Sequence, residues 1–289
     1  MSKKTKLWLL IATSAIVIGC IIFGVVMTIM DWDFSKLSTV QYVTNEYMID
    51  TDFENIRVDT GMTNVVFIPT KDGKTQVVCK ELEKVKHSVT VENGKLVISA
   101  VDERAWFDRI GINFGSPRIT VYLPQKEYAS ISVESVTGDV NCFVSASEID
   151  LHTTTGDIFV ENISAGALDL SVTTGTVTVV GTTCQNAVKV NVSTGRVNLT
   201  DVRCKSLTSE GSTGDVALEN VIATEQIVIR RSTGDVKFHR CDAGELIRVE
   251  SNTGDVKGSL LSGKIFTAKT DTGSVDVPDA TEGGGACHK

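Results

Sequence analysis

Proline is scarce in this sequence, with only four residues among 289. Because proline removes a backbone donor from a sheet, this scarcity leaves long ladders of strands uninterrupted. The seven cysteines include no Cys-x-x-Cys pair, so we expect no metal site of that kind, and no residue pattern calls for a cofactor. The formal net charge of −8 leaves no basic footprint, which argues against nucleic acid as a partner.

The sequence instead contains one short phrase, Thr-Gly followed by an apolar residue two places on, which occurs eight times between residues 131 and 277. Successive glycines of this phrase are 18 to 20 residues apart. A repeat of nearly fixed length indicates a solenoid. The eight turn glycines are Gly138, Gly156, Gly175, Gly195, Gly214, Gly234, Gly254 and Gly273.

Each repeat carries the alternation of two strands. In the fourth, Val188 and Val190 precede the glycine, and Val197 and Leu199 follow it. Apolar residues at every second place are typical of a strand with one buried face. Coils stacked at roughly 4.8 Å would join these faces into one core. The expected fold is therefore all-β, a parallel β-helix or β-solenoid of about eight coils of 18–20 residues.

The corner of each coil is expected at the glycine, with a positive φ that glycine adopts without a Cβ penalty. The neighbouring Thr and Asp suit a turn whose side chains bond their own backbone. Stacked aspartates could be relieved by Ca²⁺, which gives a Ca-stabilised surface rod as one alternative. The Gly-Gly-x-Gly-x-Asp pattern of calcium-binding rolls is missing, so solvated turn aspartates are the preferred interpretation.

A membrane segment is expected near the N-terminus. Lys3, Lys4 and Lys6 precede an uncharged run from Leu7 to Met30. The run is long enough to cross a hydrocarbon core of about 30 Å. The lysines place residues 1–6 in the cytoplasm and the C-terminal domain outside, so the chain is expected in the cell membrane as a single-pass protein.

Two alternatives to an uncleaved anchor remain open. A cleaved secretory signal has a similar plan, although its apolar core is usually about 7 to 15 residues long. The segment Val17-Ile18-Gly19-Cys20 is similar to a lipoprotein box, which would be cut and acylated at Cys20. Against lipidation, the residues that follow Cys20 continue apolar up to Met30. A membrane-buried thiol is the preferred interpretation of Cys20.

The remaining divisions follow from the loss of the strict repeat. Residues 31–50 are expected to form a juxtamembrane linker, and residues 51–130 an irregular β region that caps the rod. Strands are expected around residues 56–58, 65–68, 76–79, 88–91, 95–98 and 118–123, with a hairpin at Glu92-Asn93-Gly94-Lys95. Asp59-Thr60-Gly61-Met62 resembles a degenerate first repeat. The repeats fill residues 131–278, and residues 279–289 have the composition of a disordered tail.

Several of these features together resemble the bacterial membrane-anchored putative-adhesin (LiaG-like) β-strand-repeat family. They are the single N-terminal span, the strand Gly94–Ile98, the strand Ile119–Pro124 that ends in Leu-Pro, and the Thr-Gly-Asp-Val ladder. The resemblance covers residues 53–277 and implies a β-helix-like ectodomain associated with the cell envelope. It implies no reaction, and a fold does not fix a function.

Chemistry-bearing residues are few and dispersed. Cys184 and Cys204 occupy the same place in successive coils. Two buried thiols are the preferred interpretation, and a disulfide between them is the alternative. The four histidines are isolated and are expected at the surface. A loop that mixes aromatics with arginines could contact a partner or pack as part of the cap, and its residues are Arg104, Trp106, Phe107 and Arg109.

The function expected from the sequence is a non-catalytic, membrane-anchored extracytoplasmic β-solenoid that acts as an adhesin or as a cell-envelope interaction or stress-response module. Its expected partners are the membrane and an envelope protein or a cell-wall glycan. A carbohydrate-active β-helix enzyme is the alternative of a different class, and it would need carboxylates that converge in one groove.

Overall fold

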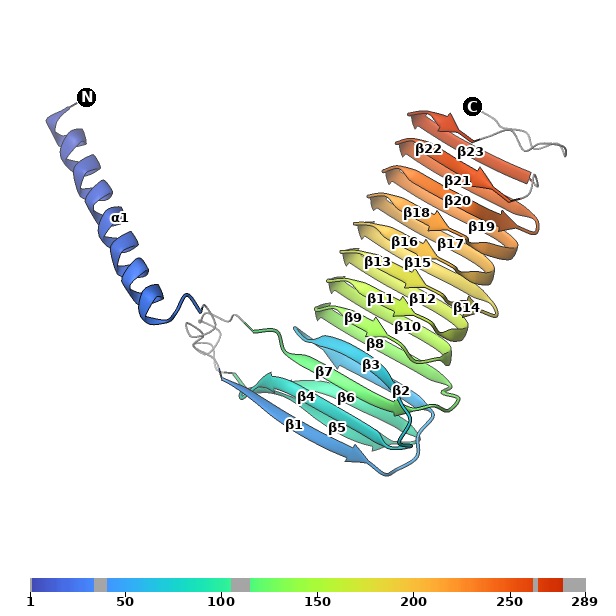
Figure 1. The fold of residues 1–289 in the computed structure, drawn as a ribbon, viewed down its shortest axis with the longest axis horizontal. Coiled ribbons are helices and arrows are strands. Elements are labelled where there is room, and N and C mark those ends of the chain that lie inside the picture. Colours follow the sequence, from blue (N-terminus) through green and yellow to red (C-terminus); the bar gives the residue numbers. More distant parts are fainter. Residues whose placement is uncertain (1, 34–40, 105–114, 262–264, 278–289) are drawn as a thin grey trace. The chain divides into compact units, whose positions relative to one another are not determined.

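The computed structural model describes residues 2–33, 41–104, 115–261 and 265–277. It divides into a unit that holds the N-terminal helix and a β unit of residues 43–102 and 117 onward (Figure 1). Most apolar side chains of the N-terminal helix are exposed. All of the stacked coils lie in the β unit.

Helix α1 runs from Lys3 to Ile29 and spans 27 residues. Its N-cap is Ser2, whose hydroxyl accepts a hydrogen bond from the Thr5 backbone N–H at 3.2 Å. Large apolar side chains are exposed along its length, for example Trp8, Ile16 and Ile22. Its length and apolar composition are sufficient to cross a membrane, although a signal sequence would meet the same criterion.

The β unit is a parallel solenoid, and the expected fold class is confirmed. Each coil contributes one strand to a first ladder and one to a second ladder (Figure 1). The first ladder contains β8 (Ser130–Thr137), β10 (Ala146–Thr155), β12 (Ser164–Thr174), β15 (Ala187–Thr194), β17 (Arg203–Thr213), β19 (Ile222–Thr233), β21 (Leu246–Thr253) and β23 (Ile265–Thr272).

The second ladder contains β9 (Val140–Cys142), β11 (Ile158–Glu161), β13 (Val177–Val180), β16 (Val197–Thr200), β18 (Val216–Glu219), β20 (Val236–Ala243), β22 (Val256–Leu260) and β24 (Val275–Asp276). A short third ladder joins the ends of neighbouring coils through β14 (Thr183–Cys184), which pairs with β12 and β17.

The core forms because like positions of successive coils stand in register. Ile149 pairs with Ile131 of the coil before and with Leu168 of the coil after. In the second ladder, Val177 pairs with Ile158 and Val197 in the same way. All six side chains are 2% exposed or less. Period-2 alternation therefore converts eight short apolar patterns into one continuous core.

The region before residue 130 extends both ladders and then closes them. Its strands are β1 (Tyr42–Ile49), β2 (Asn55–Thr60), β3 (Asn64–Thr70), β4 (Thr75–Leu82), β5 (Val85–Glu92), β6 (Lys95–Asp102) and β7 (Arg118–Pro124). β2 and β3 stack in parallel on β8 and β9, and β6 and β7 stack in parallel on β2 and β3. β5 then pairs antiparallel with β6, and β4 pairs antiparallel with β7.

The six strands expected in this region are confirmed as β2 to β7. The expected hairpin is also present, with φ of 52° at Asn93 and 72° at Gly94 between β5 and β6. The antiparallel strands give the N-terminal end of the ladders a closing layer, which blocks pairing of that edge with another chain.

Two expectations differ from the structure. Residues 42–49, placed in the linker of residues 31–50, form β1, which pairs with β4, because their alternation suits an added strand. The degenerate repeat exists, but its register is different. Val65 pairs with Val140, so Thr63 and Asn64 occupy the places of Gly138 and Asp139. Gly61, the corner expected from the sequence, has no positive φ.

Candidate functional site

The eight turn glycines have φ between 126° and 150°. Each also lies against the corner of the preceding coil. A Cβ on Gly214 would stand 1.7 Å from the carbonyl oxygen of Gly195, and one on Gly195 would meet Gly175 at the same distance. The corner therefore excludes side chains for two reasons, the backbone conformation and the close approach of the neighbouring coil.

The aspartates beside these glycines bond the next coil, which differs from the expectation that they bond their own turn. The Asp215 carboxylate accepts the backbone N–H of Asp235 at 2.9 Å, and Asp235 accepts that of Asp255 at 3.0 Å. Each carboxylate thus has one oxygen committed to an amide. Ca²⁺ needs six to eight oxygen ligands, and this column offers no such shell among the residues described.

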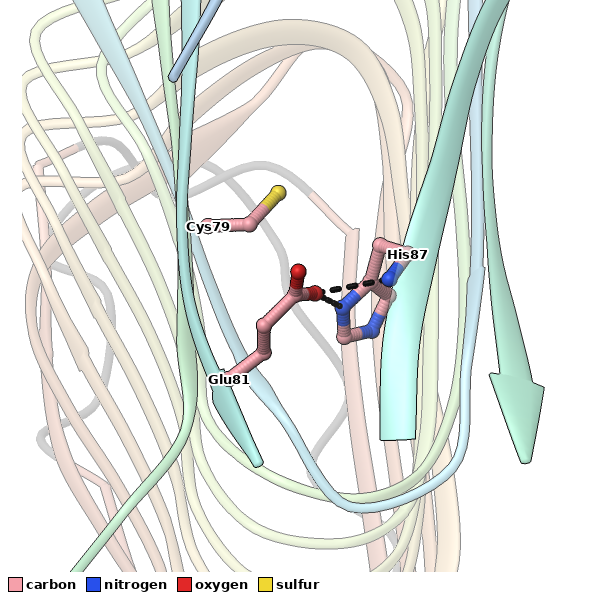
Figure 2. Close-up of side chains that lie close together, drawn as sticks. All are labelled: Cys79, Glu81 and His87. Carbon is pink, nitrogen blue, oxygen red and sulfur yellow. Dashed lines mark hydrogen bonds and ion pairs between the residues drawn. The ribbon is translucent and has the colours of Figure 1, made fainter. Parts of the chain in front are cut away.

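A buried polar cluster lies at the capped end of the core. It consists of Cys79 and Glu81 on β4 and His87 on β5 (Figure 2). β4 and β5 pair only at Leu82 and Val85, and they then separate into different ladders. Their inward side chains therefore face one another across the interior. Cys79 and Glu81 are 0% exposed and His87 is 3% exposed.

Glu81 and His87 are joined by hydrogen bonds. Oε2 of Glu81 lies 2.7 Å from Nδ1 of His87, and it also accepts the backbone N–H of His87 at 2.7 Å. Oε1 of Glu81 accepts Nδ2 of Asn45 on β1 at 2.6 Å. On the other side of the ring, Nε2 of His87 lies 3.1 Å from Oγ1 of Thr60 and 3.5 Å from Oγ1 of Thr63.

The thiol of Cys79 belongs to the cluster by proximity. Its Sγ and the ligand atoms of Glu81 and His87 all lie within 4.8 Å of one another. Burial, and then the charge of Glu81, raise the pKa of Cys79 to about 12. A cysteine nucleophile requires a thiolate, so this arrangement does not activate Cys79 for covalent catalysis. The three donors could instead hold a metal ion.

Sequence reasoning missed this cluster, although a signal was present. Val77, Cys79 and Glu81 follow the period-2 alternation of one strand face, which places a carboxylate at a core position. His87 occupies an inward place on β5 by the same rule. The expectation that His87 lies at the surface is therefore wrong.

The other residues singled out in the sequence are not brought into this cluster. Cys184 and Cys204 are buried free thiols, and Cys20 is a free thiol exposed on α1. Arg104 is half-buried at the end of a described segment. Trp106, Phe107 and Arg109 lie outside the described residues, as does the tail of residues 279–289.

Carboxylates also stack on the outer surface of the first ladder. Asp150 pairs in register with Asp169, and His152 lies between Glu134 and Ser171. Partial burial raises the pKa of Asp150, and the negative charges of Asp169 and Glu134 raise it further. These residues project from the face of a ladder, and the depressions found near β9 to β15 and near β16 to β22 are lined by other side chains. The convergent groove that a carbohydrate-active enzyme would need is not formed by this pair.

The fold has counterparts among known structures. A putative adhesin from Bacteroides fragilis matches with a TM-score of 0.53 and 19% identity, over 82% of this chain and 97% of that one. A putative adhesin from Parabacteroides merdae has a TM-score of 0.39 and 13% identity, over 86% and 97% of the two chains. One from Parabacteroides distasonis has a TM-score of 0.41 and 11% identity, over 83% and 98%.

At 19% identity, the similarity to the Bacteroides fragilis structure establishes the fold alone. No curated protein is significantly similar to this chain. The family model described as Toastrack DUF4097 matches residues 53–274, which include the closing layer and nearly all of the repeats. The chain therefore belongs to the Toastrack DUF4097 family.

Proposed function

We propose that this protein is a single-pass membrane protein whose non-catalytic β-solenoid is displayed on the outer side of the cell membrane as an adhesion or envelope-interaction module. The observation that carries the proposal is the exposed apolar surface of α1. No residue in its most apolar 18-residue window is buried. Such a surface is stable in lipid and unstable in water.

The length and flanking charges of α1 support the topology. Its 27 residues span about 40 Å at 1.5 Å per residue, more than the hydrocarbon core requires. Lys3, Lys4 and Lys6 stand at its start, and Asp31 and Asp33 follow its end. An excess of lysine favours the cytoplasmic side, so the solenoid would lie outside.

The solenoid supports a binding role more than a catalytic one. Its outer surface is built from repeated columns, and the described carboxylates of the corner column are committed to backbone amides. The Bacteroides fragilis neighbour is named a putative adhesin. An envelope protein or a cell-wall glycan would be the partner in this proposal.

The topology can be tested on the full-length chain with a C-terminal epitope tag. In intact protoplasts, external protease should remove the tag while a cytoplasmic marker survives. A variant with Lys3, Lys4 and Lys6 all replaced by Glu should reduce the protease-accessible fraction.

Mass spectrometry of the mature N-terminus distinguishes the alternatives. A chain that begins after α1 would establish a signal sequence, and an acylated Cys20 would establish a lipoprotein; either result contradicts the proposed anchor.

The interaction role is tested by crosslinking in intact cells. Wild type should capture a specific envelope protein or wall glycan. The Trp106→Ala/Arg109→Ala variant should lose that capture if the aromatic and arginine residues of this segment make the contact. Release of soluble sugars from purified wall glycan by the wild-type protein would instead support the enzyme alternative and contradict a non-catalytic role.

A further inference from the structure

The cluster of Cys79, Glu81 and His87 serves no purpose in the proposed display function, and its composition conflicts with its position. Strand β4 alternates buried and less buried residues, and the places of Cys79 and Glu81 are core places. Apolar side chains fill inward places of the neighbouring strands, such as Ile119 of β7, which pairs with Cys79, and Ile98 of β6, which pairs with Val89. A local conflict of this kind inside a consistent core points to a specific role.

We propose that Cys79, Glu81 and His87 bind a Zn²⁺ ion that joins β4 to β5 at the capped end of the solenoid. The three donor atoms already lie within 4.8 Å of one another. One sulfur, one nitrogen and one oxygen ligand form a donor set that suits Zn²⁺, whereas Ca²⁺ and Mg²⁺ require oxygen ligands. With three protein ligands, a water molecule would complete the tetrahedron.

The neighbours of the three residues are arranged as the outer partners of a metal site. If Nδ1 of His87 binds the metal, Nε2 carries the proton and donates to Oγ1 of Thr60, 3.1 Å away. Such a second hydrogen bond fixes the tautomer and the orientation of a metal-bound histidine. Asn45 donates to Oε1 of Glu81 at 2.6 Å, so the ion would bind Oε2, which keeps its hydrogen bond from the backbone N–H of His87.

Metal binding replaces protons at two places. The hydrogen bond between Oε2 of Glu81 and Nδ1 of His87 gives way to two bonds to the metal, and the proton of the neutral imidazole moves from Nδ1 to Nε2. The thiol of Cys79 loses its proton and becomes a thiolate ligand. Binding therefore releases one proton per ion, from the thiol, and tightens as the pH rises. The ion would connect strands of the two ladders where β4 and β5 pair at a single position.

The test uses full-length protein in detergent, stripped of metal by a chelator and then titrated with Co²⁺ and Zn²⁺. We expect one ion per chain, a thiolate-to-cobalt absorption band that Zn²⁺ abolishes, and a higher melting temperature with Zn²⁺ than with chelator. Cys79→Ala should lose the band and weaken Zn²⁺ binding at least tenfold. Cys142→Ala is the matched control, because Cys142 is another fully buried thiol of the solenoid. This variant should keep both the absorption band and the Zn²⁺ affinity of wild type. Thr60→Val should keep the band but weaken binding about tenfold.

Three results would overturn the proposal. One is that folded wild-type protein binds no Zn²⁺ or Co²⁺. Another is that Cys79→Ala retains the absorption band. The third is that Cys287→Ala abolishes binding while Cys79→Ala does not, which would assign the metal to the Cys287-His288 pair. Circular dichroism checks that each variant is folded, and Cys79→Ser replaces Cys79→Ala if the latter is not. None of these outcomes bears on the display function, since the metal proposal does not depend on it.

Discussion

The carboxylate of Asp139 accepts a hydrogen bond from the backbone N–H of Asp157, 18 residues later, at 3.0 Å. The same contact recurs from Asp157 to Thr176 at 2.7 Å, and from Asp255 to Ser274 at 2.8 Å. At the capped end an asparagine takes the same place, since Asn64 accepts the N–H of Asp139. The column is therefore a side-chain ladder that runs beside the backbone ladders and satisfies corner amides.

Replacing Asp215 separates the hydrogen bond from the charge. Asp215→Ala removes the acceptor of the Asp235 N–H, and we expect a loss of about 0.5–1.5 kcal/mol in the free energy of unfolding. Asp215→Asn keeps an acceptor and should lose less, as Asn64 already fills this place in a natural coil. Chemical denaturation of both variants checks this. Equal losses in the two variants would contradict the ladder.

The ladder is interrupted at Thr176, and this gives a test in the opposite direction. Thr176→Asn would offer an acceptor to the N–H of Arg196 in the next coil, and we expect a small rise in melting temperature.

A calcium-stabilised rod makes a different prediction, because its melting temperature would fall with chelator. We expect chelator to change the melting temperatures of wild type and Asp215→Ala by the same amount, because the aspartate column binds no calcium. Chelator sensitivity lost only in Asp215→Ala would instead establish a calcium site there.

A methyl group at a corner glycine should be costly. Gly214 has a φ of 126°, and its Cβ would meet the Gly195 carbonyl at 1.7 Å. Gly214→Ala should lower the free energy of unfolding by more than about 1 kcal/mol. Gly61→Ala is the control, because Gly61 has open space and no positive φ. Comparable melting temperatures for Gly214→Ala and wild type would show that the corner relaxes at no cost.

Most of the fold could be predicted because the repeat is strict. The glycines count the coils, and apolar pairs such as Val188 and Val190 identify the inward face without any tertiary information. The register of the first coil could not be predicted in this way. A Thr-Gly pair stands at Thr60-Gly61, but inward stacking of Val65 on Val140 decides the pairing, and burial of the core outweighs a local turn signal.

The site was harder to predict because its residues are meaningful only together. His87 is separated from Glu81 by the turn at Leu82–Val85, and from Thr60 by 27 residues. Alternation alone places Glu81 and His87 in the core. That they face each other depends on β4 and β5 entering different ladders, which is a property of the topology and not of either strand.

A buried arginine in the repeats provides a further test. Arg231 is 4% exposed, and its Nη2 donates to Oγ of Ser209 at 2.9 Å, while its Nε has no hydrogen-bond partner among the described residues. Gly211 leaves the space that its guanidinium fills. Burial lowers the pKa of Arg231 to about 10.

Removing the partner of this arginine should cost more than removing the charge itself. Ser209→Ala leaves a buried guanidinium with one bond fewer, and we expect a loss of about 1–3 kcal/mol in the free energy of unfolding. Arg231→Met eliminates the buried charge and should lose less, because apolar replacements of buried ions are often neutral. Denaturant unfolding of the two single variants and the double variant measures the coupling. A larger loss for Arg231→Met than for Ser209→Ala would contradict this account.

Acid should weaken the last corner of the Asp ladder in a specific pH range. Lys257, together with the backbone N–H and hydroxyl of Ser274, lowers the pKa of Asp255 from 3.8 to about 2. A carboxyl group whose pKa is lowered by folding stabilises the fold at pH values above the pKa that it has in the unfolded chain. That contribution is lost as the pH falls from about 4 towards 2. Thermal melts between pH 5 and pH 2 should therefore show a smaller acid-induced decline for Asp255→Asn than for wild type. Lys257→Met removes the largest cause of the shift and raises the folded pKa of Asp255, so the decline of this variant should be smaller and should end at higher pH than that of wild type. If the Asp255→Asn and wild-type curves stay parallel over this range, Asp255 does not contribute to acid sensitivity, and its bonds to Ser274 are too weak in water to matter.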